Sequence, residues 1–315
     1  MTRYAAIDVG TNTIRLLVAE VEDTATYRPV FQDQVITRLG EGLQESGLLS
    51  PRAVERTLQV LQRFSQTAKE LEAEEVVAIA TSAAREAKNQ TEFLNRARTE
   101  VGLEVQVASG EEEATLTALG VSHALGPARG SMLIMDIGGG STEFISLEHR
   151  RITGRLSLPI GVVKLTEAHL RADPPSLNEL ETAAAFLRKD LRQVPALLDP
   201  PPGGILAGTA GTPTTLAAID LGLVTYDPER VTGHPLSRDR IQELLEHLCS
   251  LPLAERRQIV GLEPGRADVI VAGALLTREV MMLLRFNELT VSDGGFREGI
   301  LLRHSAQRKR GSRSD

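Results

Sequence analysis

The sequence predicts an α/β protein built from two related domains, and three observations support this prediction. Its 315 residues are more than one ordinary domain needs. Apolar patterns typical of strands alternate along the chain with patterns typical of amphipathic helices. One strand–turn–strand segment also occurs twice, with Asp136 in the second copy lying 128 positions after Asp8 in the first.

The N-terminal part begins with three predicted strands, Tyr4–Asp8, Ile14–Val21 and Pro29–Val35, which form an antiparallel meander. Ser50 and Pro51 then have the pattern of a helix N-cap and a first-turn proline, and a long amphipathic helix follows. The later elements expected in this part are a strand at Val76–Thr81, a helix near Glu92–Val101, a strand at EVQVAS, a helix from Glu111 and a strand at SMLIMDIG.

The C-terminal part continues the alternation. Its expected elements are helices near Val162–Leu170, Ser176–Leu197 and Gly211–Ile219, three helical patterns between Ser237 and Leu284, a last helix from about Gly295, and strands at GILAGT and ELTVSD. The proline-rich loop Asp199–Gly204 is too short to link two domains. We place the first domain at residues 1–122, completed by a C-terminal helix at 296–315, and the second at residues 123–295.

The two copies of the repeated segment, YAAIDVGTNTIRLLVAEV and SMLIMDIGGGSTEFISLE, align without a gap, so Gly10 falls on Gly138 and Thr13 on Ser141. Such a turn can direct several backbone N–H groups and hydroxyls toward one point, which makes an anion nest. A tight hairpin is the alternative, but an ordinary hairpin does not need an aspartate before the turn in both copies. The candidate phosphate-binding residues of the turns are Gly10, Thr11, Asn12, Thr13, Gly138, Gly139, Gly140, Ser141 and Thr142.

The aspartates that precede the turns predict a metal. If the turns face each other, a phosphate chain lies close to Asp8 and Asp136, and a divalent cation, Mg²⁺ or another, must separate the like charges. Side chains two positions apart share a strand face, so Arg15 and Glu143 are expected to point the same way as Thr13 and Ser141. We therefore expect Asp8, Asp136 and Glu143 as metal ligands and Arg15 as a phosphate ligand.

Composition argues against several functions. The net charge is −7 and aromatic residues make up only 3% without any tryptophan, which argues against nucleic-acid binding. No run approaches the roughly 18 apolar residues of a membrane helix, and the N-terminus lacks the pattern of a signal peptide, so we expect a cytoplasmic protein that binds no membrane. Cys249, the single cysteine, lies in a helical pattern and is expected to be a buried apolar thiol.

Three polar features have an ordinary structural explanation as well as a functional one. The basic segment RHSAQRKRGSRSD at the C-terminus is expected to be a frayed, solvated end rather than an anion site. The arginines Arg52, Arg56 and Arg63 are expected to form a solvated helix face. We expect a structural role for His234 in the turn VTGHPL.

Six ordered motifs make the sequence similar to a known family. These are IDVGTNTIRLLVAEV, ATSAAREAKN, SGEEEATLTALGV, MDIGGGSTEF, GTAGTPTTLAA and VSDGGFREGILL. Together, over about residues 3–303, they resemble the exopolyphosphatase and guanosine pentaphosphate phosphohydrolase (Ppx/GppA) family, in its short two-domain form, within the actin, Hsp70 and sugar-kinase superfamily. The resemblance implies two ribonuclease H-type domains of mixed sheet and helices with an active site in the interdomain cleft.

The resemblance also implies roles for particular residues. Glu113 in SGEEEA becomes the general base, with Glu112 as the alternative, although three glutamates can also simply complement the positive end of a helix. A helix N-terminus with a guanidinium at Thr81, Ser82 and Arg85 could bind a phosphate group. The residues that occupy the nucleotide-side motif of the superfamily, where they could hold a nucleoside or more of a phosphate chain, are Gly208, Thr209, Gly211 and Thr212.

The expected reaction is therefore magnesium-assisted hydrolysis of a terminal phosphoanhydride. Inorganic polyphosphate is the first expected substrate, and the 5′ end of guanosine pentaphosphate is the nearest alternative. Two other classes stay open, namely a phosphotransferase, because kinases share the fold, and a protein that binds polyphosphate or guanosine tetraphosphate without turnover. Longer family members carry an additional helical C-terminal region, so short-chain polyphosphate or guanosine pentaphosphate is expected as substrate rather than processive action on very long chains. The family also suggests a homodimer.

Overall fold

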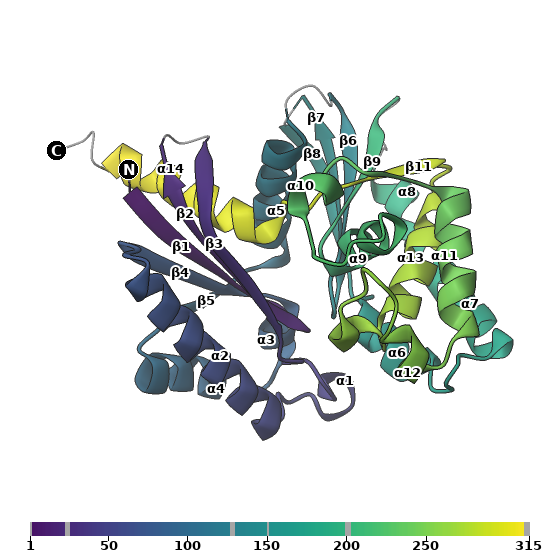
Figure 1. The fold of residues 1–315 in the computed structure, drawn as a ribbon, viewed down its shortest axis with the longest axis horizontal. Coiled ribbons are helices and arrows are strands. Elements are labelled where there is room, and N and C mark those ends of the chain that lie inside the picture. Colours follow the sequence, from purple (N-terminus) through teal and green to yellow (C-terminus); the bar gives the residue numbers. More distant parts are fainter. Residues whose placement is uncertain (1, 23–25, 127–129, 150, 199–202, 312–315) are drawn as a thin grey trace. The chain divides into compact units, whose positions relative to one another are not determined.

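The computed structural model describes residues 2–22, 26–126, 130–149, 151–198 and 203–311. The chain forms two compact units, one made of Met1–His123 with Phe296–Asp315 and the other of Ala124–Gly295. Each unit has its own sheet and its own apolar core, and Figure 1 shows the helices that flank each sheet.

The first unit contains a five-stranded mixed sheet. Its strands are β1 (Thr2–Val9), β2 (Thr13–Val21), β3 (Tyr27–Ile36), β4 (Glu75–Ala80) and β5 (Val105–Val107), in the order β3-β2-β1-β4-β5. The first three strands are antiparallel neighbours, which confirms the predicted meander, while β4 and β5 run parallel to β1. The N-terminal sequence therefore forms a hairpin-based sheet that parallel strands extend on one side.

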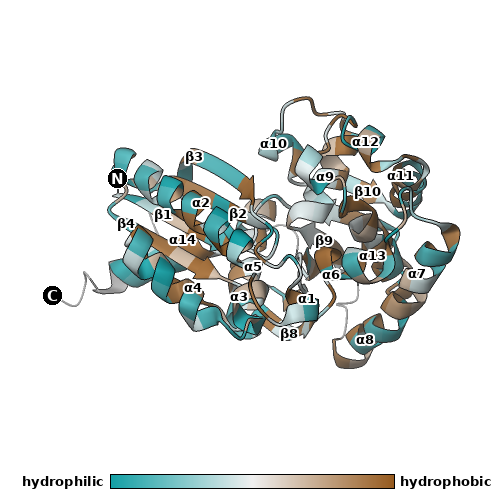
Figure 2. Cartoon of the chain, turned by 90° about the horizontal axis from the view of Figure 1, so that it is seen from below, coloured by the Kyte–Doolittle hydropathy of each residue, from teal (hydrophilic) through white to brown (hydrophobic). Residues whose placement is uncertain are grey.

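Helices cover both faces of this sheet. They are α1 (Leu43–Ser46), α2 (Pro51–Glu70), α3 (Ser82–Glu86), α4 (Gln90–Arg96), the π-helical turn η1 (Ala97–Val101), α5 (Gly110–Leu125) and α14 (Phe296–Gly311). The helix α2 starts as expected, because the Ser50 hydroxyl accepts a hydrogen bond from the amide of Ala53 at 3.2 Å. Figure 2 shows hydrophobic colour along one side of α2 and hydrophilic colour along the other.

Side chains on the two faces of the central strands belong to two different apolar clusters. Ile7 and Leu61 belong to the cluster on the α2 face, whereas Ala6, Ile79 and Ile300 belong to the one that α5 and α14 cover. On the second face the two helices approach closely, because a Cβ on Gly299 would lie only 1.9 Å from the carbonyl oxygen of Leu116. The C-terminal helix is thus an integral part of the first unit.

The basic C-terminal segment differs from the expected frayed end. The helix α14 continues to Gly311, His304 lies 3.1 Å from a carboxylate oxygen of Glu75, and Arg308 pairs with the same carboxylate. The His304 ring also stands edge-on to the ring of Tyr4. The predicted solvated end is therefore wrong as far as residue 308, because these contacts tie the helix to the sheet, and residues 312–315 lie outside the described residues.

The second unit contains a six-stranded mixed sheet. Its strands are β6 (Met132–Ile137), β7 (Thr142–Glu148), β8 (Arg151–Leu158), β9 (Ile205–Thr209), β10 (Pro235–Ser237) and β11 (Glu288–Val291), in the order β10-β11-β9-β6-β7-β8. Its helices are α6 (Val162–His169), α7 (Leu177–Leu191), α8 (Gln193–Leu197), α9 (Gly211–Asp220), α10 (Pro228–Val231), α11 (Arg238–Ser250), α12 (Leu253–Arg256), the 3₁₀ turn η3 (Pro264–Arg266) and α13 (Ile270–Leu283). Of the Asp199–Gly204 loop, residues 199–202 lie outside the described residues.

The two sheets share one topology. Read from the opposite end, the second sheet is β8-β7-β6-β9-β11, which repeats the order and the strand directions of β3-β2-β1-β4-β5 and adds β10 at its edge. This confirms the predicted α/β fold with two ribonuclease H-type sheets. The strands β8 and β10 were not predicted from the sequence. In β8 the residues alternate between exposed and partly buried positions, and Arg151 and Arg155 lie on its exposed face, so its apolar signal is weak.

Two further expectations concern single residues of the second unit. Cys249 packs at the edge of the apolar core, and burial raises the pKa of its thiol to about 11, which agrees with an unreactive thiol. His234 has the structural role expected for it, because its Nε2 lies 2.7 Å from Asp220, which also pairs with Arg240.

The long helix α2 has an outer face of arginines that is only partly solvated. Arg56 donates to the Thr37 carbonyl oxygen and pairs with Glu41, Arg63 pairs with Asp33, and Arg52 is exposed. Within the ranges that the structure covers, no helix is both long and apolar enough to cross a membrane.

Candidate active site

The first glycine turn connects β1 to β2. The amide of Gly10 donates to the carbonyl oxygen of Thr13 at 3.1 Å, and a Cβ on Gly10 would lie only 2.8 Å from that oxygen. The Thr13 hydroxyl is buried and has no hydrogen-bond partner among the described residues. A buried hydroxyl without a protein partner is costly unless water or a ligand binds it, so this turn is suited to a polar ligand.

The second glycine turn repeats this geometry between β6 and β7. The amide of Gly138 donates to the carbonyl oxygen of Ser141 at 3.0 Å, and a Cβ on Gly138 would lie 3.0 Å from it. The strand registers also agree, since Asp8 pairs with Arg15 across β1 and β2, and Asp136 pairs with Glu143 across β6 and β7. The gapless alignment of the two segments is thereby confirmed.

Each turn is held by another segment that binds its carbonyl oxygens. The amides of Thr37 and Arg38 donate to the Asn12 carbonyl oxygen at 3.0 and 2.9 Å, and the Gly40 amide donates to Thr11 at 2.9 Å. In the second unit, Val162 and Val163 at the start of α6 donate to Gly138 and Gly139 at 3.0 and 2.9 Å.

The same segments also pack closely against the turns. A Cβ on Gly161 would lie 2.4 Å from backbone atoms of Gly139 and Gly140, and one on Gly40 would lie 2.4 Å from the Thr11 side chain. These supporting segments, residues 37–40 and the start of α6, therefore occupy carbonyl oxygens of the turns and not their amides. Within the described ranges, no protein group accepts a hydrogen bond from the amides of Thr11, Asn12, Gly139 or Gly140. Backbone amides of a turn that have no protein acceptor can donate to an anion.

Two carboxylates lie side by side in the second unit. Asp136 and Glu143 are both buried and are direct partners on neighbouring strands, which puts their side chains on one face of the sheet. One oxygen of Glu143 accepts a hydrogen bond from the Ser157 hydroxyl at 2.8 Å. Among the described residues no group of three or more His, Cys, Asp or Glu side chains is placed to hold a metal. Two carboxylates still suit Mg²⁺, which usually retains several waters.

Glu112 and Glu113 differ sharply in their surroundings. The Glu113 side chain is 10% exposed, and one of its oxygens accepts a hydrogen bond from Nη1 of Arg85 at 2.9 Å. The Glu112 side chain is 53% exposed and forms a capping box, in which it accepts from the Ser109 amide while the Ser109 hydroxyl accepts from the Glu112 amide, both at 3.2 Å. Glu112 thus has a helix-capping role, whereas Glu113 is buried beside a guanidinium.

Arg85 is itself fixed in place. Its Nη1 also donates to the carbonyl oxygen of Ala108 at 2.8 Å, and Ala108 in turn donates to Ala80 at the end of β4. The Thr81 amide donates to Val9 beside the first turn, so Thr81 lies near Asp8 and Gly10. The structure therefore brings the first turn, α3 and the start of α5 to the carboxyl ends of β1, β4 and β5, where α/β sheets commonly bind ligands.

Ser82 is differently placed. Its hydroxyl donates to Glu86 at 2.7 Å, so it already has a partner within α3. The short helix α3 has only five residues, which leaves Arg85 as the stronger phosphate-binding candidate of this segment.

The nucleotide-side motif of the second unit lies at the carboxyl end of β9. Thr209 is the register partner of Asp136, and its hydroxyl donates to the Gly294 carbonyl oxygen at 3.0 Å. Gly208 leaves room for Pro213 and Leu289, while Gly273 leaves room for the Thr212 side chain. Close packing is therefore one reason for these small residues.

Arg266 was missed by the sequence reasoning. A Cβ on Gly211 would lie 1.8 Å from its Nη1, so the buried guanidinium lies directly against the start of α9, and its Nε pairs with Glu263 at 3.0 Å. No pattern around GLEPGRAD connects Arg266 with a loop more than 50 residues earlier. Only the fold brings this guanidinium to the loop.

Each unit thus has a glycine turn with amides that have no acceptor among the described residues and a buried aspartate before that turn, and the first unit adds a glutamate held by an arginine. Comparison with known sequences identifies the family. Residues 17–307 match the Ppx/GppA phosphatase family, and the chain belongs to this family. The family expected from the six motifs is thereby confirmed.

The relatives cover nearly the whole chain. Exopolyphosphatase 2 of Mycobacterium tuberculosis (strain ATCC 25618 / H37Rv) is 35% identical over 318 residues, which cover 96% of this chain and 98% of the relative. Among solved structures, the Aquifex aeolicus member of the Ppx/GppA family has a TM-score of 0.82 at 34% identity, with 98% of each chain covered. An exopolyphosphatase from Cytophaga hutchinsonii has a TM-score of 0.87 at 28% identity, covering 97% of this chain and 98% of that one.

The capping role of Glu112 predicts a stability effect. Glu112→Ala should lower the free energy of unfolding by about 1 kcal/mol, because the capping box at the start of α5 is lost. Urea unfolding at neutral pH measures the change. The matched control is Glu111→Ala, which removes a charge from the same turn but no side chain of the capping box. Equal losses for both variants would mean that the negative charge alone matters.

Proposed function

We propose that this protein hydrolyses the terminal phosphoanhydride of inorganic polyphosphate and releases orthophosphate. The observation that carries the proposal is the buried Glu113 held by Arg85, since a hydrolase needs a positioned base and a protein that only binds does not. The relative in Mycobacterium tuberculosis that is named an exopolyphosphatase, and that matches over 98% of its length, supports the substrate.

The proposed reaction begins with proton removal. Arg85 fixes one oxygen of Glu113 at 2.9 Å, and the carboxylate takes a proton from the attacking water. The water oxygen forms a bond to the terminal phosphorus in line with the departing chain, and the bond from that phosphorus to the bridging oxygen breaks. The products are orthophosphate and a chain shorter by one phosphate. Glu113 acts here as a base that does not bond to phosphorus.

The glycine turns would bind phosphate rather than react with it. The amides of Thr11, Asn12, Gly139 and Gly140 offer donors to the non-bridging oxygens, and the buried Thr13 hydroxyl offers another. The segments that hold the turns fix these donors in place. The protein therefore needs little reorganisation when charge shifts in the transition state. Arg15, the register partner of Asp8, would add a positive charge in the first unit.

A divalent cation is proposed to assist. Asp136 and Glu143 would hold it in the second unit, and Asp8 is the equivalent carboxylate of the first unit. When bound, Mg²⁺ would neutralise charge on the phosphate oxygens. Ser157 orients one oxygen of Glu143, so the protein fixes the direction of at least one ligand carboxylate before a cation arrives.

The base assignment predicts a large kinetic effect. Glu113→Gln should lower the rate of phosphate release by at least about a hundredfold, because the amide cannot take the proton, while the affinity for polyphosphate is largely retained. Phosphate release and polyphosphate binding are measured separately. Glu112→Gln is the matched control and should keep most of the activity. Undiminished release in the Glu113 variant would exclude it as the base.

The metal assignment predicts a changed magnesium dependence. Asp136→Asn should shift the Mg²⁺ titration of activity to higher concentration, because one anionic ligand is lost. The thermal shift that Mg²⁺ causes without substrate should shrink as well. Glu148→Gln is the control, since Glu148 is an exposed residue at the end of the same β7 strand that carries Glu143. A titration identical to wild type would place the metal elsewhere.

A side-by-side assay tests the function and its alternatives. Orthophosphate release should be fastest from polyphosphate, and short and long chains show which length is preferred. Guanosine pentaphosphate has a similar terminal phosphoanhydride, and faster release from it would make that nucleotide the substrate. Phosphate transfer from ATP to a small acceptor would indicate a phosphotransferase, and binding of polyphosphate without release would indicate a sensor.

A further inference from the structure

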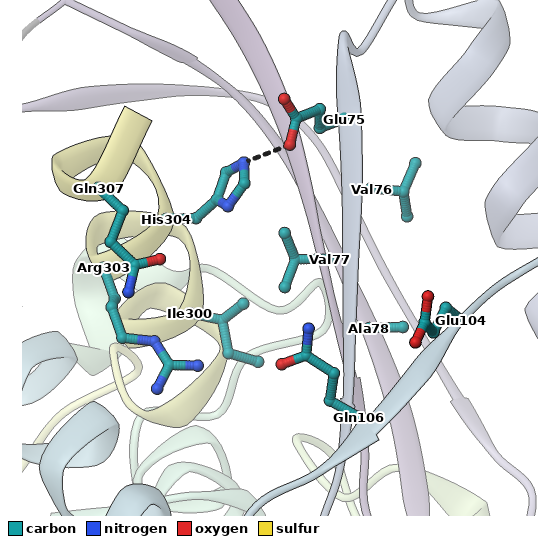
Figure 3. Close-up of a pocket in the computed structure, with 10 residues that line it drawn as sticks. All are labelled: Glu75, Val76, Val77, Ala78, Glu104, Gln106, Ile300, Arg303, His304 and Gln307. Carbon is teal, nitrogen blue, oxygen red and sulfur yellow. Dashed lines mark ion pairs between the residues drawn. The ribbon is translucent and has the colours of Figure 1, made fainter. Parts of the chain in front are cut away.

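A polar cavity lies in the first unit, away from the glycine turn. It has a volume of about 240 Å³ and lies between α14 and the strands β4 and β5 (Figure 3). Its sheet side begins at Glu75, the first residue of β4, whereas the first turn lies beyond the opposite end of that strand. The cavity is therefore separate from the residues proposed for catalysis.

The lining combines an apolar floor with polar side chains. Val77 from β4 and Ile300 from α14 provide the apolar surface. Figure 3 shows Arg303 and Gln307 projecting from α14, and Gln106 projecting from β5 on the side of the helix. One guanidinium and two carboxamides thus surround an apolar patch. This composition is typical of small-molecule sites, where a few polar groups orient a ligand on an apolar surface.

Most of these polar groups have no strong partner within the protein. Among the described residues, the amides of Gln106 and Gln307 and the carboxylate of Glu104 make no side-chain hydrogen bond or ion pair. Arg303 lies 3.5 Å from an oxygen of Glu112, a long contact between partly exposed groups. Such surface pairs contribute little stability, so a ligand can recruit Arg303 at small cost.

The acidic residues restrict the charge of the ligand. Glu75 is already paired with His304 at 3.1 Å and with Arg308, as the dashed line in Figure 3 marks for His304. Glu104 adds a second carboxylate to the lining. Because Glu75 is offset by Arg308, the uncompensated carboxylate is Glu104, which repels a dianion such as orthophosphate more strongly than a monoanion that Arg303 can balance.

We propose that this cavity binds a small monocarboxylic acid that carries a hydroxyl or amino group. The fork of Arg303 matches a carboxylate, and the amides of Gln106 and Gln307 can donate to the same group. The carbon skeleton contacts Val77 and Ile300, and Glu104 accepts a hydrogen bond from the hydroxyl or ammonium group. The volume of about 240 Å³ is sufficient for such a molecule, since a cavity of about 150 Å³ already holds benzene.

Calorimetric titration of the full-length protein with lactate, alanine and propanoate tests this proposal, with orthophosphate as the comparison. Saturable binding of lactate or alanine is expected, with propanoate weaker and orthophosphate weakest. Arg303→Gln should weaken binding at least about tenfold, because the charged fork is lost. The control is Arg98→Gln, an exposed arginine of η1 in the same unit, which should leave the affinity unchanged.

A second variant covers the chance that Arg303→Gln disturbs α14. Gln106→Leu on the edge strand β5 should weaken binding while the melting temperature stays near that of wild type. The proposal is overturned if none of the carboxylates binds saturably, if both variants bind as wild type does, or if orthophosphate binds as tightly as lactate. Because the titration contains no polyphosphate, its outcome is independent of the function proposed above.

Discussion

The hydrogen bond from the Gly10 amide to the Thr13 carbonyl oxygen, and its counterpart from Gly138 to Ser141, sets the geometry of both strand pairs. These hydrogen bonds are 3.1 and 3.0 Å long, a side chain has no room on Gly10 and little on Gly138, and the chain reverses within a few residues. The register that follows puts an aspartate on the last part of one strand opposite Arg15 or Glu143 on the next. The carboxylates and the amides of each unit therefore come to the same end of its sheet.

The segments that hydrogen-bond to the glycine turns determine which groups of the turns remain available to a ligand. Segments after β3 and at the start of α6 donate to the carbonyl oxygens of the turns, which a phosphate could not use. The remaining groups are N–H donors and a buried hydroxyl, and these favour an anion. The proposed phosphate-binding surface therefore depends on the loss of acceptors and not on a lysine, because neither turn contains one.

Arg85 and Glu113 connect three elements of the first unit. The guanidinium contacts the end of the segment after β5 and the first turn of α5, so it fixes the glutamate relative to the sheet. The sequence alone does not decide which of three consecutive glutamates is the proposed base. The structure separates Glu112 from Glu113 by burial and by partner, because one faces the Ser109 cap and the other faces Arg85.

Much of the architecture could be predicted because it depends on local patterns. The meander, the Ser50 cap, the strand–helix alternation and the repeated turn all follow from side-chain periodicity and from glycines placed after strands. The edge strand β8 could not be predicted, since one of its faces is solvated and carries arginines. The basic segment RHSAQRKRGSRSD was expected to fray because its composition gives no sign of the Glu75 and Tyr4 side chains that contact it.

The amino-acid sequence by itself determined the two hairpins, their equivalence, the α/β fold and the family, since these are written in residue order and spacing. Tertiary structure alone decided which glutamate is buried, which segments brace the turns, and that Arg266 lies against Gly211. It also decided that Arg303, Gln106 and Gln307 surround a cavity. These contacts join residues far apart in the chain, and no local pattern encodes a distance that only packing of the whole unit sets.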